Sequence, residues 1–265
     1  MRYLPLLLIS VILFVASGCS SKTDPISQKI VQKQTEQNQN SDEDAFLDEF
    51  EEEMHIEKKS DPFSSYNRVM TGFNDGLFEY VVSPVARGYK NVVHKEIRSS
   101  VGNFFHNILY PVRLVNNLLQ GKFKNSAEET GRFVVNTTVG ILGLFDPAKS
   151  YFKLKSHDED FGQTLGFYGV GAGPHIVLPF FGPSNLRDMV SLYPDSVIDP
   201  IEYHHHRVYN LTNSYGESLL VKAYGRVNYV SLHQGEYEKL KKDAVDLYPY
   251  LRNVYEQYRE QKIKE

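Results

Sequence analysis

The chain has 265 residues, a formal net charge of −4, no tryptophan, 18 tyrosines and 16 phenylalanines. Residues 1–60 hold 6 Lys and Arg against 11 Asp and Glu, which leaves residues 61–265 nearly neutral, at +1. This balance argues against a nucleic-acid partner, whose surface needs a basic excess, and the single cysteine, Cys19, excludes a disulfide within the chain.

The N-terminus has the features of a lipoprotein signal. Arg2 precedes an uncharged apolar run at 6–16, which is shorter than the roughly 20 residues of a membrane span. Small residues then lead into Cys19 in the order VASGC, which is similar to the lipobox of bacterial lipoproteins. We expect residues 1–18 to be a lipoprotein signal peptide, with acylated Cys19 as the lipid anchor. The alternative is a cysteine that is removed with an ordinary signal peptide.

Residues 19–60 have the composition of a tether. They are rich in Lys, Gln, Asn and Ser and include the acidic run 42–53. Such a composition buries too little apolar surface to offset the entropy lost on ordering, so we expect a disordered acidic tether. The alternative is that Phe46, Leu47 and Phe50 form one turn of an amphipathic helix that docks on a partner.

From residue 61 onward, apolar residues recur at helical spacing. A first helix is expected from residue 66 to 85, with Pro84 at a kink or a new first turn. A second is expected from 104 to 119, stopped by Gly121. The capping-box pattern Ser126-x-x-Glu129 predicts the start of a third, which runs to residue 145.

The C-terminal part gives weaker signals. Residues 193–200 are rich in turn formers and are expected to be a connection. Helices are expected at 209–230, with a break near Gly225, and at 240–258, interrupted by Pro249, with a frayed end after it. No segment alternates convincingly like a strand, so the predicted fold class is all-α.

One stretch fits neither helix nor strand. Residues 166–188 read GFYGVGAGPHIVLPFFGPSNLRD, which is apolar, aromatic and interrupted by glycine and proline. Irregular backbone of this kind is tolerated at membrane depth only where protein buries it or where it lines a watery cavity. Its glycines are spaced G-x-G-x-G and lead through Pro174 into another apolar run, so they do not form a dinucleotide loop.

The sequence contains no complete catalytic motif. G-x-S-x-G, H-E-x-x-H and Walker A patterns are absent, so we expect no enzyme, no metal and no cofactor. Two clusters leave alternatives open. The histidines at 204–206 chelate a metal or lie in an exposed loop, and residues 157–160 (HDED) hold calcium or form a solvated loop. In both cases the loop is the favoured interpretation.

Four segments together carry a resemblance to a known family. They are Asp61-Pro62, Tyr66-Asn67-Arg68, Phe73-Asn74 and Pro84-Val85-Ala86; Arg132-Phe133, Asn136-Thr137, Gly140, Gly143 and Asp146; residues 160–166 (DFGQTLG), 169–174 (GVGAGP) and Leu178-Pro179; and residues 182–184 (GPS) with Leu186-Arg187-Asp188. Over about residues 61–200, these segments resemble the MlaA (VacJ) family of outer-membrane lipoproteins. The long acidic tether departs from the family, and the C-terminal helices match less well.

The resemblance implies a helical domain at 61–265, a ring-like bundle of short amphipathic helices around a central channel, embedded in the periplasmic leaflet of the outer membrane. It implies removal of mislocalised phospholipids from the outer leaflet and their transfer to a periplasmic carrier protein, with trimeric porins as neighbours. No bond is broken, so the resemblance implies no catalytic residue. The alternative is a structural envelope lipoprotein or surface factor without a lipid conduit.

The resemblance also implies which residues line the lipid path. For the residues of the first helix the alternative role is capping and core packing, and for the Arg-Asp pair it is a structural salt bridge. A glycine-bearing hairpin between about residues 146 and 179 is implied to help gate the channel. The candidate residues are Asn67, Arg68, Phe73, Asn74, Gly169, Gly171, Gly173, Pro174, Arg187 and Asp188.

Overall fold

The computed structural model describes residues 61–205, 207 and 209–265. The expected signal peptide, the anchor Cys19 and the acidic tether lie outside the described residues. The helices are α3 (Ser64–Leu77), the π-helix η2 (Phe78–Val82), α4 (Ser83–Val92), α5 (Lys95–Ile108), α6 (Tyr110–Leu119), α7 (Phe123–Thr138), α8 (Pro147–Ser150), α9 (Phe161–Phe167), α10 (Leu186–Ile198), α11 (Tyr215–Leu232), α12 (Glu236–Asp243) and α13 (Leu247–Lys264).

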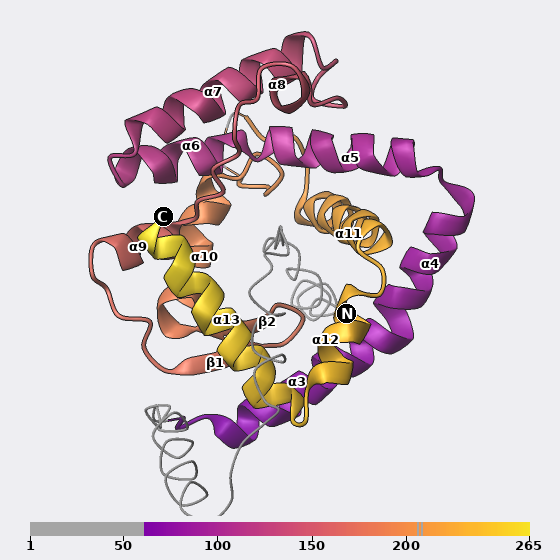
Figure 1. The fold of residues 1–265 in the computed structure, drawn as a ribbon, viewed down its shortest axis with the longest axis vertical. Helices are drawn as coiled ribbons and strands as arrows, with labels where there is room; N and C mark the ends of the chain where they lie inside the picture. Colours follow the sequence, from indigo (N-terminus) through magenta and orange to yellow (C-terminus); the bar gives the residue numbers. More distant parts are fainter. Residues whose placement is uncertain (1–60, 206, 208) are drawn as a thin grey trace, which may run out of the picture. The chain divides into compact units, whose positions relative to one another are not determined.

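The helices contact one another in a closed circuit (Figure 1). Helices α3, η2 and α4 follow one another along the chain, and α5 and α6 come next. Helix α6 packs against α9, α9 against α13, and α13 returns to α3. Helix α11 packs against α4 and α5, and α7 packs against α6. The predicted all-α class is therefore confirmed, apart from one small hairpin.

That hairpin lies within the glycine- and proline-rich stretch, where we expected no strand. Strands β1 (His175–Leu178) and β2 (Gly182–Asn185) pair antiparallel, with His175 opposite Asn185 and Leu178 opposite Gly182. Proline is tolerated in β2 because a two-stranded sheet has only edge strands, which can lack a ladder donor. The turn between the strands uses left-handed backbone at Phe180 (φ 67°) and Gly182 (φ 86°).

The first two predicted helices are subdivided in the structure. Pro84 lies in the first turn of α4, which confirms a new first turn, and η2 precedes it. The helix predicted from 104 to 119 is two helices, α5 and α6, because Pro111 in the first turn of α6 cannot continue the ladder of α5. Gly121 ends α6 with a φ of 69°, as predicted.

The capping-box prediction is wrong, because α7 begins at Phe123 and both residues lie inside the helix. Ser126 Oγ donates to the carbonyl of Lys122 (3.0 Å). Glu129 is fully buried and accepts from Arg113 Nε (2.7 Å) and from the backbone N–H of His157 (2.7 Å). The glutamate thus joins neighbouring elements instead of capping its own helix.

Helix α7 ends at Thr138, seven residues before the predicted end. Ile141 (φ 53°), Leu142 (φ 56°) and Gly143 (φ 88°) have left-handed backbone, and the N–H of Gly143 bonds the carbonyl of Asn136 (2.8 Å). A Cβ on Gly140 would lie 2.5 Å from backbone oxygens, so the turn needs glycine there. The apolar composition of this segment predicts burial in core or membrane equally well, but it does not reveal the turn.

Three C-terminal expectations are also wrong. Residues 193–198 belong to α10, which continues through Pro194. Helix α11 passes through Gly225 without a break. The glycine leaves room for Phe105, whose ring lies 3.3 Å from the position that a Cβ would take there. The end expected to fray is helical to Lys264. The interruption expected at Pro249 does occur, since α12 ends at Asp243 and α13 begins at Leu247, with Pro249 in its first turn, where the missing N–H costs no bond.

The distribution of polar and apolar side chains is the reverse of a soluble domain. Among the described residues, seven apolar side chains are buried, against 28 polar or charged ones. Another 35 large apolar side chains are exposed. No helix in the described ranges is both long and apolar enough to cross a bilayer. Hydrogen bonds and ion pairs, more than apolar packing, therefore hold these elements together.

Candidate functional site

Two asparagines of α3 fix the hairpin. Asn67 Nδ2 donates to the carbonyl of His175 (3.0 Å), and its Oδ1 accepts from the N–H of Val177 (2.8 Å). Two helical turns on, Asn74 makes the same pair of bonds with Leu178 O (3.0 Å) and Phe180 N (2.8 Å). Asn67 therefore pairs with β1 as a strand would, and Asn74 fixes the end of β1 and the turn, which supports the packing alternative for these two residues.

The other two candidates on α3 are partly exposed. Arg68 Nη1 donates to Asp246 Oδ2 (2.6 Å), and its guanidinium lies 5.4 Å from the centre of the Tyr248 ring. Phe73 is 44% exposed and meets Phe180 edge-on, with ring centres 5.1 Å apart. These contacts connect α3 to the start of α13 and to the hairpin turn.

The glycine-rich loop between α9 and β1 is partly open. Gly169 has a φ of 82°, and neither there nor at Gly171 would a Cβ meet any atom within 4 Å. Gly173 has a φ of 70°, and its Cβ would lie 3.1 Å from Leu186. The carbonyl of Pro174 accepts from the N–H of Leu186 (3.1 Å). Gly169 and Gly171 thus border open space, whereas Gly173 and Pro174 pack against the start of α10.

Arg187 and Asp188 belong to a buried ionic network. Arg187 Nε donates to Asp188 Oδ1 (2.9 Å), and Tyr255 OH donates to Asp188 Oδ2 (2.6 Å). Arg259 lies between Asp188 (2.9 Å) and Asp160, to which it donates from both Nη atoms (2.5 and 2.8 Å). The network joins α9, α10 and α13, which supports the salt-bridge alternative for the Arg-Asp pair.

The network perturbs its titratable members. Burial alone would raise the pKa of the Asp160 carboxyl, but the charge of Arg259 outweighs it and holds that pKa below its usual value. Burial, reinforced by the charge of Asp188, raises the pKa of the Tyr255 hydroxyl. Burial, reinforced by the charge of Asp160, raises the pKa of Asp195 from 3.8 to about 7. Asp195 accepts bonds from Asn116 Nδ2 (2.9 Å) and from the N–H of Phe161 (3.0 Å).

The raised pKa of Asp195 predicts a pH-dependent stability. Because the folded state binds this proton more tightly than the unfolded state, the contribution of Asp195 becomes less favourable as pH rises from about 4 to about 7. Asp195→Asn keeps an acceptor and removes the charge. We expect it to stabilise the protein by about 1–3 kcal/mol at pH 8 and negligibly at pH 4.

Urea unfolding at both pH values, followed by circular dichroism, measures this difference. The control is Asp243→Asn, which removes an exposed carboxylate at the end of α12. An Asp195→Asn effect that does not change between pH 4 and pH 8 would contradict the assignment.

The two possible metal clusters resolve differently. Glu159 is buried, and it accepts from Lys122 Nζ (2.6 Å) and Gln120 Nε2 (2.8 Å), so the solvated-loop interpretation is wrong for this residue. His204 bonds the carbonyl of Ser196 (2.9 Å), and His205 is exposed. His206 is not described. Among the described residues, no three His, Cys, Asp or Glu side chains are grouped to hold a metal ion.

A cavity of about 280 Å³ lies between α3, η2, the hairpin, α11, α12 and α13. Part of its lining is charged or titratable, and part is apolar. The charged part comprises Arg226, His233 and Glu236, and the apolar part includes Phe78, Val177, Phe181, Leu240 and Leu251.

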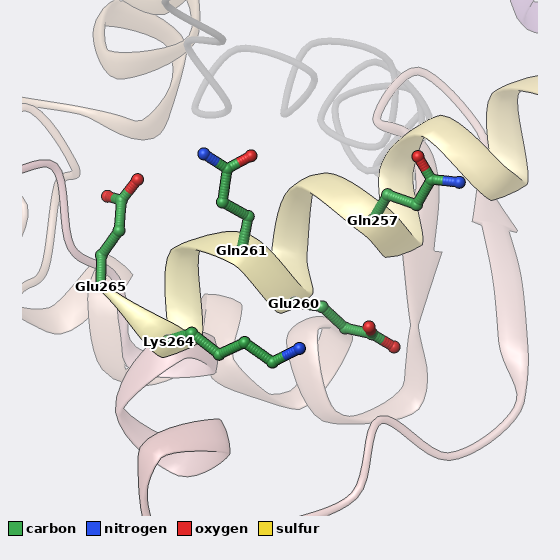
Figure 2. Close-up of a pocket in the computed structure, with 5 residues that line it drawn as sticks. All are labelled: Gln257, Glu260, Gln261, Lys264 and Glu265. Carbon is green, nitrogen blue, oxygen red and sulfur yellow. The ribbon is translucent and has the colours of Figure 1, made fainter. Parts of the chain in front are cut away.

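A second hollow, of about 410 Å³, is less suited to binding. Figure 2 shows that four of its five side chains come from the C-terminal half of α13, with Gln257 and Gln261 on one side of the helix and Glu260 and Lys264 on another, and that the fifth, Glu265, follows the end of the helix. All five, which include Glu265, are polar or charged. One polar helix face offers neither an apolar wall nor a second element to enclose a ligand, so the 280 Å³ cavity is the better candidate.

Sequence reasoning missed most of these residues. Arg226, His233 and Glu236 of the cavity, and Asp195 and Arg259 of the network, carry no motif, whereas Asp160 lies in the segment DFGQTLG. Tyr255 and Arg259 are one helical turn apart, which places them on one face of α13, but this spacing is common on solvated helices. Their partners are far away in the sequence, so only the fold brings them together.

Comparison with known proteins gives consistent matches. A sequence profile of the family described as MlaA lipoprotein matches residues 59–262. An uncharacterised protein of Rickettsia typhi is 36% identical over 205 residues, covering 77% of this chain and 78% of that protein. The intermembrane phospholipid transport system lipoprotein MlaA of Escherichia coli is 39% identical over 133 residues, covering 49% of this chain and 53% of that protein.

A solved structure agrees with these matches. It is described as the structural basis for maintenance of bacterial outer membrane lipid asymmetry, and it is 29% identical to this chain, with a TM-score of 0.63. The alignment covers 77% of this chain and all of that one. The resemblance predicted from the sequence is thereby confirmed. Because the profile match covers most of the chain, the protein belongs to the MlaA lipoprotein family.

Proposed function

We propose that this protein takes part in phospholipid transport at the outer membrane and so maintains its lipid asymmetry. It removes mislocalised phospholipids from the outer leaflet through an amphipathic channel and passes them to a periplasmic carrier, without breaking a bond. Family membership and the names of the E. coli and Haemophilus influenzae relatives, each an intermembrane phospholipid transport system lipoprotein, support this proposal.

The observation that carries the proposal is the reversed distribution of side chains. A monomeric soluble protein rarely exposes large apolar patches, whereas the described part of this one exposes 35 large apolar side chains and buries mainly polar ones. An apolar exterior suits acyl chains, and a polar interior suits sheltered contact with head groups. We therefore propose that the helices lie in the periplasmic leaflet of the outer membrane, anchored by acylated Cys19.

The turn after α7 is the strongest candidate for insertion into the leaflet. Val139, Ile141, Leu142 and Phe145 are between 55% and 66% exposed. Ile141 is β-branched and has a φ of 53°, which costs about 1–3 kcal/mol. A glycine or asparagine would adopt this backbone more easily, so an apolar side chain stands here at the cost of backbone strain.

Replacing Ile141 and Leu142 with asparagine is therefore expected to leave the fold intact and to weaken membrane binding. The double variant, purified without its lipid anchor, should bind phospholipid vesicles at least about tenfold less than the native chain, because about 2–3 kcal/mol of apolar burial is lost. Vesicle flotation measures the bound fraction. The control is Val245→Asn, which replaces an isolated exposed valine between α12 and α13. Equal flotation of the native chain and the double variant would exclude insertion by this turn.

The function itself is tested in a deletion strain. Loss of the protein is expected to raise the amount of phospholipid in the outer leaflet and to increase sensitivity to detergent and chelator. An unchanged outer leaflet would contradict the proposal and favour a structural envelope lipoprotein or surface factor.

A variant of the glycine-rich loop separates a conduit from a scaffold. A Cβ at Gly171 would meet no atom within 4 Å, so Gly171→Leu should fold normally. If the loop borders the lipid path, as we propose for Phe73, Gly169 and Gly171, the variant should fail to restore the outer leaflet. Gly88→Leu, at a helical glycine that is equally open, should restore it. Full restoration by Gly171→Leu would remove the loop from the path.

A further inference from the structure

The 280 Å³ cavity combines two surfaces that no single helix provides. Its apolar wall includes Phe78 from η2, Phe181 from the hairpin turn and Leu251 from α13. Its charged side is built by Arg226 and by Glu236, from the end of α11 and the start of α12. The volume is just below the usual range for small-molecule sites, about 300–1,000 Å³. It therefore suits a head group and the beginning of its chains, and not a whole lipid.

We propose that this cavity binds an amine-bearing phospholipid by its head group. The phosphate lies against Arg226, the ammonium group lies against Glu236, and the first methylenes of the acyl chains contact the apolar wall. The inference rests on the proposed transport function and adds a head-group preference to it.

Aromatic stacking holds the basic side of the cavity in place. The guanidinium of Arg226 lies 5.7 Å from the centre of the Tyr229 ring. The imidazole of His233 stacks on the same ring, with centres 4.0 Å apart and planes 23° from parallel. Tyr229 follows Arg226 by three residues on α11, and His233, the residue that caps the end of α11, follows Tyr229 by four, so one face presents the whole stack. A planar guanidinium fixed in this way is suited to the tetrahedral oxygens of a phosphate.

The acidic side of the cavity supplies selectivity. Glu236 is the first residue of α12, positioned by the left-handed backbone of Gly235 (φ 87°). Its carboxylate attracts the ammonium group of phosphatidylethanolamine. The hydroxyls of a glycerol head group carry no positive charge, so they would leave the charge of this carboxylate uncompensated. A phospholipid of net charge −1 also meets a like charge there. Discrimination against a competing ligand by such repulsion is a common source of specificity.

The absence of tryptophan from the chain allows a direct test. Phe181→Trp places a single fluorophore at the cavity, and phospholipids with brominated acyl chains quench it on contact. The full chain in mild detergent is titrated with brominated phosphatidylethanolamine and, separately, phosphatidylglycerol. The ethanolamine lipid is expected to reach half-maximal quenching at about a tenfold lower concentration, the effect of one charged hydrogen bond.

Second-site variants in the same protein locate the effect. Glu236→Gln should abolish the difference between the two lipids in the concentration needed for half-maximal quenching. Arg226→Gln should raise that concentration about tenfold for both lipids. The matched control is Lys239→Gln, which removes an exposed charge of α12 that does not line the cavity. In the reference variant Tyr151→Trp, whose site is 81% exposed, both lipids should quench alike.

Equal quenching by the two lipids at the cavity would overturn the head-group assignment, and no response to Arg226→Gln would overturn the site. Should the tryptophan variant fail to fold, mass spectrometry of lipids that co-purify with the native chain is the second measurement. Enrichment of ethanolamine lipid over the bulk membrane supports the inference, and an unenriched mixture contradicts it. A normal outer leaflet in the deletion strain would instead reject the transport function and leave the binding preference standing.

Discussion

Replacing Gly162 with alanine is expected to destabilise the protein by about 2–4 kcal/mol. Gly162 lies on α9 against the ionic network, and a Cβ there would stand 2.4 Å from Asp188 Oδ1 and 2.6 Å from Arg259 Nη2. Both atoms are the ends of side chains, but neither can move freely, because Arg259 bonds Asp160 and Asp188 at the same time. Relief of the clash therefore requires breaking buried charge pairs or separating α9 from α13.

Urea unfolding in mild detergent, followed by circular dichroism, measures the loss. Gly88→Ala is the matched control, since Gly88 is also helical and a Cβ there meets nothing within 4 Å. The control variant should be up to about 1 kcal/mol more stable than the native chain, from helix propensity alone. If Gly162→Ala unfolds at the same urea concentration as Gly88→Ala, the ionic network is not packed as closely as the distances indicate.

Arg259→Met is expected to cost about 3–5 kcal/mol, the usual loss when one partner of a buried ion pair is removed. The side chain is 8% exposed and neutralises two carboxylates, Asp160 on α9 and Asp188 on α10. Methionine preserves most of the volume, so the loss reports the uncompensated charges and not a cavity. Thermal unfolding of the native chain and the variant at pH 7 gives the comparison.

The exposed pair Lys262–Glu265 provides the contrast on the same helix. Lys262→Met removes a cation of α13 that is one-quarter exposed, and its loss should be below about 1 kcal/mol. Adding Asp160→Asn to Arg259→Met should recover part of the stability, because one of the two orphaned charges is removed with its partner. No recovery would indicate that Arg259 acts through packing alone.

The family and the helical class could be predicted from the sequence because both depend on local signals. Apolar spacing predicted helices at the N-terminal half, and Gly121 and Pro84 marked boundaries where the structure has them. Both residues act through their own backbone, so their effect does not depend on distant partners. Family identity followed from the order of short motifs such as DFGQTLG.

Several of the failures share one physical origin, which is that polar side chains took distant partners. Ser126 and Glu129 fit a capping box, yet Glu129 is needed by Arg113 on α6. Residues 157–160 look like a solvated acidic loop, yet Glu159 and Asp160 neutralise buried cations. Likewise Pro194 favours a turn, but α10 continues, and the next residue, Asp195, bonds the start of α9. In a protein with a polar interior, local patterns of polar residues are therefore poor predictors of helix caps, turns and solvated loops.

The hairpin illustrates the same principle and has a further consequence. A two-stranded sheet leaves backbone groups on its outer edges that can recruit a strand from another chain. On β1 this outer edge is occupied by the amide of Asn67, which bonds His175 and Val177, while Asn74 bonds Leu178 at the strand end and Phe180 in the turn. Helix α3 thus covers this edge without contributing a strand. Asn67 therefore also protects against aggregation, because a chain that lost it would expose a short, partly apolar template for intermolecular β-pairing.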